Sequence, residues 1–134
     1  MQPVRHLLSI LSLISAATLT ACAGTATPMN LAATAELHCG RIASVTVVDD
    51  VLTIGAGEKP TPGYSVQLTE QTRKGDHLTV EYAISEPPQG AILAQMMTSP
   101  CSHISLPEDW QRLTVQNKTS GQQWVFERPE PEQQ

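Results

Sequence analysis

Apolar and polar residues alternate along much of this chain, most clearly between His77 and Ile84. Leu78, Val80, Tyr82 and Ile84 would share one face of an extended segment, while the other face carries histidine, threonine and glutamate. Successive side chains of a β-strand point to opposite faces, so this period of two predicts a half-buried strand.

Similar alternation predicts strands elsewhere, at residues 42–48, 51–54, 65–69, 101–106, 113–115 and 124–126. Polar turn residues at 73–76 and 117–121 would join neighbouring strands as two hairpins. Residues 89–97 fit a short helix as well as a buried strand, and we favour the strand. Strands about every ten residues, separated by Gly and Pro turns, predict an all-β fold, a small antiparallel sandwich or barrel-like domain.

The N-terminal residues 1–21 read as a signal peptide, with Arg5 and His6 before an apolar run that is too short to span a bilayer. The stretch Leu19-Thr20-Ala21-Cys22 resembles a bacterial lipobox. That resemblance implies cleavage before Cys22 and a diacylglyceryl group on its thiol. The alternative is an ordinary secreted protein in which Cys22 is buried.

Lipidation would make the membrane a partner of this protein through its anchor. Two or more acyl chains, palmitate among them, hold a protein more firmly than the marginal grip of one chain. The second residue of the mature chain would be Ala23 rather than the aspartate that marks inner-membrane retention in the Gram-negative sorting rule. We therefore expect a lipid-anchored protein of the cell envelope, at the outer rather than the inner membrane.

Composition suggests the boundaries of the folded part. Residues 22–36 are mostly small and polar, which favours a lipid-anchored flexible tether. Residues 128–134 alternate proline with glutamate and predict a disordered tail. The β domain is then expected at residues 37–127.

Charge excludes one class of partner. The 134 residues include 8 basic and 13 acidic side chains, a net charge of −5, and the basic residues form no cluster. Binding to DNA or RNA depends largely on neutralising phosphates with Lys and Arg. We therefore expect no nucleic-acid partner.

Three cysteines remain to be assigned. If Cys22 is lipidated, Cys39 and Cys101 are left in an oxidising compartment and should form a disulfide. The alternative is a metal site built from both cysteines with His38 and His103, but no CxxC or HxxxH spacing supports it. We expect the disulfide, and neither a metal nor another cofactor.

Three segments rich in turn residues carry a family resemblance. In Thr61-Pro62-Gly63-Tyr64, proline and glycine occupy the central positions that specify a type II turn. The other two segments, 86–90 and 98–107, are punctuated by prolines. Together they resemble the C-terminal domain of the PrcB family, over about residues 51–107, in which a Pro-Thr-x-Gly-Tyr turn precedes a strand and a Thr-x-Pro segment leads to a final Ile/Leu-Pro.

The resemblance implies a role without catalysis. PrcB is named for a lipoprotein subunit of a bacterial surface protease complex, and its family is regarded as an accessory or chaperone-like partner of the protease. The resemblance therefore implies that the partner of this protein is an envelope protease or another envelope protein. The binding loop would be formed by Lys59, Pro60, Thr61, Gly63 and Tyr64.

Other interpretations of this loop remain open. Lys-Pro-Thr-Pro-Gly-Tyr also looks like the Asn-Pro-Thr-Thr-Gly-Tyr loop of chagasin-type cysteine-protease inhibitors, although Lys59 replaces the asparagine and Pro62 a threonine. Their aromatic-rich third loop has no counterpart here, since Arg128-Pro129 is followed by Glu130. The loop could also be a plain turn, with Tyr64 packed over the sandwich edge, in a purely structural lipoprotein.

The sequence contains no recognisable catalytic motif. A hydrolase needs a nucleophile, a base and an orienting group that converge on one site. None of the candidate residues lies in a recognisable nucleophile motif: Ser65, Ser99, Ser102, His77, His103, Asp49 and Asp50. We expect no enzymatic activity, and we interpret Asp49-Asp50 as a turn rather than a calcium site.

Overall fold

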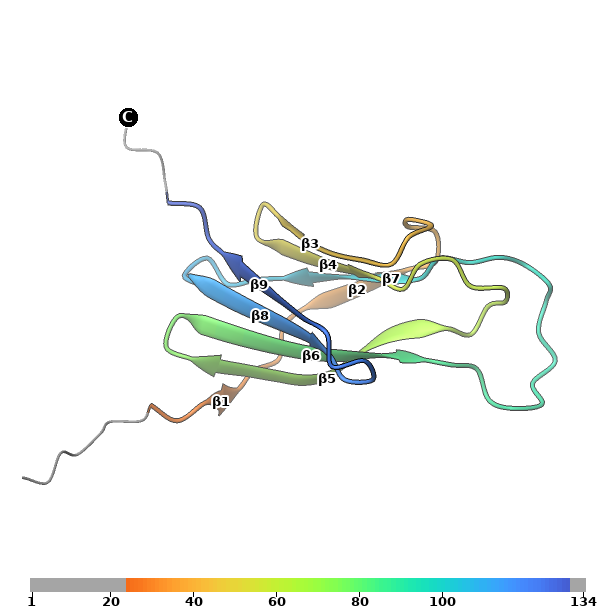
Figure 1. The fold of residues 1–134 in the computed structure, drawn as a ribbon, viewed down its shortest axis with the longest axis horizontal. Helices are drawn as coiled ribbons and strands as arrows, with labels where there is room; N and C mark the ends of the chain where they lie inside the picture. Colours follow the sequence, from red (N-terminus) through yellow and green to blue (C-terminus); the bar gives the residue numbers. More distant parts are fainter. Residues whose placement is uncertain (1–23, 131–134) are drawn as a thin grey trace, which may run out of the picture.

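The computed structural model describes residues 24–130 and consists of β-strands joined by turns and loops (Figure 1). Within that range no helix is long and apolar enough to cross a membrane. The predicted signal peptide at 1–21 and the lipidation site at Cys22 lie outside the described residues.

The strands form two sheets. One has five strands in the order β1 (Thr27–Pro28), β5 (Ser65–Lys74), β6 (His77–Ser85), β8 (Arg112–Asn117) and β9 (Gln123–Glu127). The other has four strands in the order β2 (Ala33–Glu36), β7 (Cys101–Ser105), β4 (Val51–Gly55) and β3 (Ser44–Val48). Their inner faces pack together, which confirms the predicted all-β sandwich.

The core lies between the sheets and is built from the alternating positions seen in the sequence. Leu52, Ile54 and Ile104 come from the four-stranded sheet, and the five-stranded sheet contributes Leu78, Val80, Leu113 and Val115; all seven are fully buried. Burying a side chain of this size stabilises the fold by about 1.5–3 kcal/mol. Apolar burial on alternate residues therefore sets which face of each strand points inward.

One strand pair departs from the expected antiparallel pattern. β6 and β8 run parallel, with Leu78 opposite Leu113 and Val80 opposite Val115. After β6 the chain crosses to the other sheet, forms β7 there, and returns. Parallel neighbours require such a crossover because a short hairpin joins only antiparallel strands.

The favoured strand at residues 89–97 is wrong. The described structure has no regular strand there, and the residues form part of the crossover from β6 to β7. Ile92 is fully exposed, and Met96 and Met97 are about half exposed. The apolar residues that suggested a strand therefore lie on a loop.

The expected tether at 22–36 differs from the structure from Thr27 onward, where two strands form. β1 pairs with the end of β5, β2 pairs along β7, and the amide of Met29 donates a hydrogen bond to the carbonyl of Gln71 at 2.8 Å. Both strands are exposed, so their small side chains gave no hydrophobic pattern. Backbone pairing, which needs no apolar side chain, holds them in place.

The predicted tail begins later than residue 128. The amide of Arg128 donates to the carbonyl of Gln111 at 2.8 Å, and its guanidinium donates to Oδ2 of Asp50 at 2.9 Å. Arg128 therefore belongs to the fold, and residues 131–134 lie outside the described range.

Candidate functional site

The disulfide predicted between Cys39 and Cys101 is present, and it joins residues 62 positions apart. Its two halves meet because β2 pairs with β7, placing Glu36 directly opposite Cys101 just before the chain turns through Cys39. Backbone contacts fix that turn independently, since the amide of Cys39 donates to the carbonyl of Ser99 at 3.0 Å. The Cα atoms of the two cysteines lie 6.1 Å apart.

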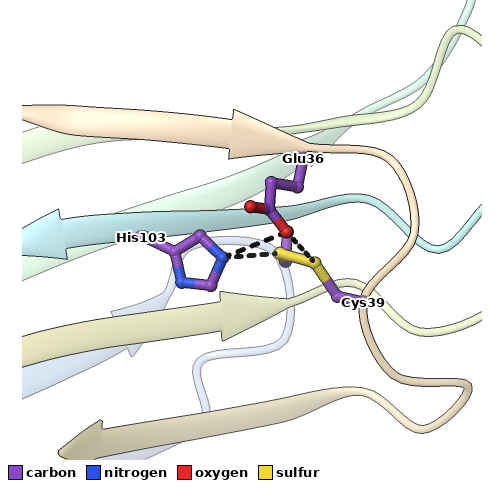
Figure 2. Close-up of side chains that lie close together, drawn as sticks. Glu36, Cys39 and His103 are labelled. Atoms are coloured by element: carbon purple, nitrogen blue, oxygen red, sulfur yellow. Dashed lines mark hydrogen bonds and ion pairs between the residues drawn. A yellow bond between two sulfur atoms is a disulfide. The ribbon is translucent and has the colours of Figure 1, made fainter.

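Glu36 and His103 flank the disulfide (Figure 2). Nε2 of His103 lies 3.5 Å from Sγ of Cys101 and 3.6 Å from Oε2 of Glu36. The same carboxylate oxygen lies 3.9 Å from Sγ of Cys39. One donor atom from each of these four residues lies within 4.8 Å of the other three. We refer to Glu36, Cys39, Cys101 and His103 as the disulfide cluster.

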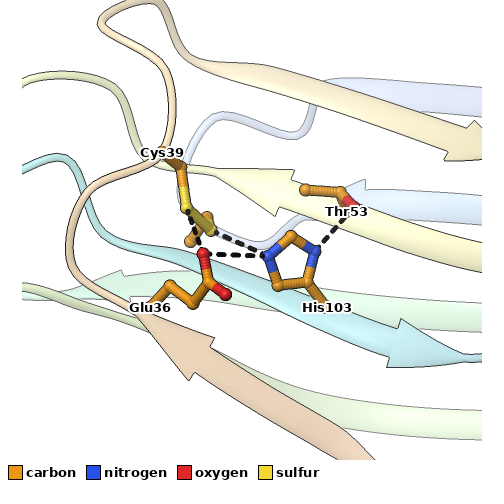
Figure 3. The surroundings of a disulfide bond; sticks show 5 residues. Glu36, Cys39, Thr53 and His103 are labelled. Carbon is orange, nitrogen blue, oxygen red and sulfur yellow. Dashed lines mark hydrogen bonds and ion pairs between the residues drawn. A yellow bond between two sulfur atoms is a disulfide. The ribbon is translucent and has the colours of Figure 1, made fainter.

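The ring of His103 is held from its other side as well. Its Nδ1 lies 3.0 Å from Oγ1 of Thr53, which is its direct neighbour on β4 (Figure 3). Cys101 and His103 are two residues apart on β7 and so share one face of the sheet. The pairing of three strands thus sets the positions of Glu36, Cys101, His103 and Thr53.

This arrangement differs from the metal alternative considered in the sequence. His38 is exposed and is bridged to Ser99 through its backbone, and it is not a member of the disulfide cluster. Glu36 lies there instead. Sequence reasoning missed Glu36 because its proximity to Cys101 depends on the β2–β7 register. While the disulfide is intact, its sulfurs carry no negative charge to bind a metal ion.

The loop predicted to bind a partner, residues 59–64, lies against the crossover. Lys59 and Thr98 exchange two backbone hydrogen bonds, of 2.7 and 2.9 Å. Thr98 is 2% exposed, and its hydroxyl donates to the carbonyl of Thr61 at 3.2 Å. These three bonds hold the beginning of the 59–64 loop to residues just before β7.

The second half of the 59–64 loop is fixed by a turn and by packing. Gly63 has a φ of 98°, as the third position of a type II turn requires. A Cβ atom there would lie 2.8 Å from Cβ of Pro87, so the crossover also packs against this glycine. Nζ of Lys59 lies 5.6 Å from the centre of the Tyr64 ring, while Pro60 is exposed at the tip.

Four of the residues considered for catalysis have defined places in the strands and turns. The side chain of His77 is hydrogen-bonded to the hydroxyl of Thr114 at 2.9 Å, and that of His103 to Thr53. Asp49 and Asp50 have φ values of 47° and 61° and join β3 to β4, which confirms that they form a turn. The two histidines thus bond to threonines on neighbouring strands.

The family of PrcB C-terminal domains matches residues 51–107 of this chain, which confirms the resemblance. The matched stretch runs from the start of β4 to just beyond β7 and includes the 59–64 loop, the crossover, Cys101 and His103. Glu36, Cys39 and the last two strands lie outside it. No curated protein and no solved structure matches the chain.

Proposed function

We propose that this protein, whose residues 51–107 form a PrcB C-terminal domain, is a lipid-anchored, non-catalytic protein of the cell envelope that binds another envelope protein. The partner we favour is a protease or its precursor, as the family resemblance implies. Contact would be made through the 59–64 loop and the adjacent edge of β5. Cys22 would carry the anchor, at the outer membrane.

The fixed conformation of the 59–64 loop carries this proposal. Its hydrogen bonds to Thr98 and the packing of Gly63 against Pro87 hold it before any partner arrives. A loop already ordered in its binding conformation avoids the entropy cost of being ordered on association. Pro60 at the exposed tip restricts the backbone further.

The strand that follows the loop offers a second recognition element. Within the described residues, β1 pairs with β5 only at Thr72 and Arg73, so residues 65–70 have β6 as their one paired strand. An extended segment of another protein could add to this free edge through backbone hydrogen bonds, a common mode of peptide recognition. The edge begins directly after Tyr64.

Exposed apolar side chains of the crossover would add a third element to this surface. Ile92, Met96 and Met97 are exposed on the crossover that also contacts Lys59 through Thr98. Exposed apolar patches on small proteins often mark protein-binding sites, and methionine adapts readily to a partner's shape. The 59–64 loop, the β5 edge and this patch would thus form one interface.

Crosslinking in intact cells followed by affinity capture tests this proposal. We expect wild-type protein to capture an envelope protease, and the double variant K59A/Y64A to lose it while retaining the fold. The matched control is K74A at the far end of β5, which should capture normally. Capture that is indifferent to K59A/Y64A, or no captured protein, would contradict the proposal. The activity of the captured protease would distinguish an accessory protein from an inhibitor.

A further inference from the structure

We propose that reduction of the Cys39–Cys101 disulfide converts the disulfide cluster into a Zn²⁺ site. Zinc is bound in proteins by thiolate, imidazole and carboxylate groups, usually four of them in a tetrahedron. The cluster offers two sulfurs, one imidazole and one carboxylate within 4.8 Å of one another. This site shares no residue with the proposed protein-binding loop, and the inference does not rest on the proposed function.

The spacing of the donor atoms is already close to that of a zinc tetrahedron. With zinc bonds of about 2.3 Å to sulfur and 2.0–2.2 Å to nitrogen or oxygen, the edges of the tetrahedron measure about 3.3–3.8 Å. Three contacts have nearly these lengths: His103 to Cys101 at 3.5 Å, His103 to Glu36 at 3.6 Å, and Glu36 to Cys39 at 3.9 Å. The two sulfurs must separate once their bond is broken, and the two remaining pairs, His103 with Cys39 and Glu36 with Cys101, lie within 4.8 Å.

The ring of His103 is oriented as a metal-binding histidine should be. Nε2 faces the cluster, and Nδ1 lies 3.0 Å from Oγ1 of Thr53. With a metal ion on Nε2, Nδ1 carries the proton and donates it in a hydrogen bond to Thr53. Metal-binding histidines almost always use their second nitrogen in this way, which fixes both the tautomer and the ring orientation.

The backbone supports the cluster without help from the disulfide. Glu36 lies opposite Cys101 in the β2–β7 ladder, and Thr53 lies opposite His103 in the β4–β7 ladder. Two backbone hydrogen bonds to Ser99 hold the turn that carries Cys39. The carbonyl of Ser99 accepts from the amide of Cys39, and the amide of Ser99 donates to the carbonyl of Leu37 at 2.8 Å. Reduction would therefore leave the ligands close together.

The chemistry balances with one co-reactant, a dithiol reductant. Its two thiols transfer two electrons and two protons to the disulfide, yielding the thiols of Cys39 and Cys101 and an oxidised reductant with a disulfide of its own. Zn²⁺ then binds the two sulfurs in place of the two thiol protons, which are released to solvent. The zinc ion is neither oxidised nor reduced. The disulfide and zinc forms are thus mutually exclusive.

Cobalt substitution tests the site. The full chain with C22A, which leaves Cys39 and Cys101 as its cysteines, is reduced with a phosphine that does not compete as a thiol ligand. Titration with Co²⁺ should produce the visible bands of a tetrahedral thiolate site at one ion per chain, and Zn²⁺ should abolish them. The oxidised protein should give no such bands. If the reduced protein also gives none, the proposal is overturned.

Variants separate a folded site from binding by an unfolded chain. H103A should weaken Co²⁺ and Zn²⁺ binding at least tenfold, and T53V should weaken it by about 10–100-fold while leaving the ligands intact. H38A is the matched control and should change nothing. In an unfolded reduced chain, His38 beside Cys39 would be at least as available as His103. Equal losses from H38A and H103A would therefore overturn the proposal.

Discussion

The carboxylate of Asp50 accepts a hydrogen bond from the indole Nε1 of Trp110, at 2.8 Å, and so links the two sheets at one end of the sandwich. Asp50 lies in the β3–β4 turn, whereas Trp110 lies just before β8 and is 2% exposed. The other carboxylate oxygen of Asp50 accepts from Arg128 after β9. One turn residue thus satisfies a buried donor and holds the end of the last strand.

Replacing Asp50 should show how much its hydrogen bond from Trp110 contributes to stability. D50A leaves the indole N–H of Trp110 without its acceptor, which should lower the free energy of unfolding by about 1–3 kcal/mol. D50N should cost less, because the amide oxygen can still accept from Trp110 and asparagine tolerates the positive φ. Urea denaturation measures both. D49A is the control, since Asp49 shares the positive φ but not the bond to Trp110; equal losses from D49A and D50A would contradict this account.

The disulfide should contribute strongly to stability. On the chain-entropy model, closing a loop between residues 62 positions apart contributes about 4 kcal/mol. The double variant C39S/C101S should lose up to this amount in chemical denaturation. As a check on the bond itself, thiol labelling of the denatured, unreduced C22A protein should find no free thiol. Detection of two free thiols would refute the disulfide in the isolated protein.

The 59–64 loop should be sensitive to a single added methyl group. G63A places a Cβ against Pro87 and also strains a backbone whose φ is 98°. G90A is a matched control, because its φ is 79° but nothing lies within 4 Å of the added atom. We expect G63A to be more destabilising in thermal unfolding and to reduce partner capture, while G90A keeps capture. Equal behaviour of the two variants would show that the contact with Pro87 is unimportant.

The pair formed by Arg73 and Asp109 should make stability depend on acid pH. Two hydrogen bonds from the Arg73 guanidinium, at 3.0 and 2.6 Å, hold the pKa of Asp109 below its ordinary value of 3.8. Because the folded-state pKa is lowered, the contribution of Asp109 is present above pH 3.8 and is lost as the pH falls through the folded-state pKa. D109N should therefore reduce the drop in urea midpoint between pH 6 and pH 3. If D109N leaves the fall in urea midpoint unchanged, other carboxylates cause the acid sensitivity.

Lipid anchoring is tested at the cysteine itself. C22A should block processing of the precursor or release the protein from the membrane fraction, since the thiol that receives the diacylglyceryl group is gone. Fractionation and intact-mass measurement detect these outcomes. C101S is the control and should remain anchored, because Cys101 is in the disulfide rather than the lipobox. A C22A protein that is cleaved, membrane-bound and of unchanged mass would exclude the anchor.

Side-chain alternation predicted the strands but not their partners. Period-two patterns located β6 and β8 because their inward residues are buried, yet the parallel pairing of these strands depends on where the chain crosses between sheets. β1 and β2 escaped prediction because both are exposed and held by backbone bonds. Because β2 was not predicted, its register with β7 could not be foreseen, and that register brings Glu36 to Cys101. Glu36 was therefore missed as part of the disulfide cluster.

The position of β1 would limit how far a lipid-anchored domain could lie from a membrane. Thr27 pairs with Arg73 near the end of β5, and it lies only five positions after Cys22, with four residues between them. Five positions reach at most about 18 Å, so an anchored protein would lie close against the lipid headgroups. The 59–64 loop adjoins the opposite end of β5, a strand of ten residues, and in Figure 1 its end of the sandwich lies away from β1. A short attachment near β1 would therefore leave the 59–64 loop at the opposite end of β5, up to about 30 Å from the attached end of the strand.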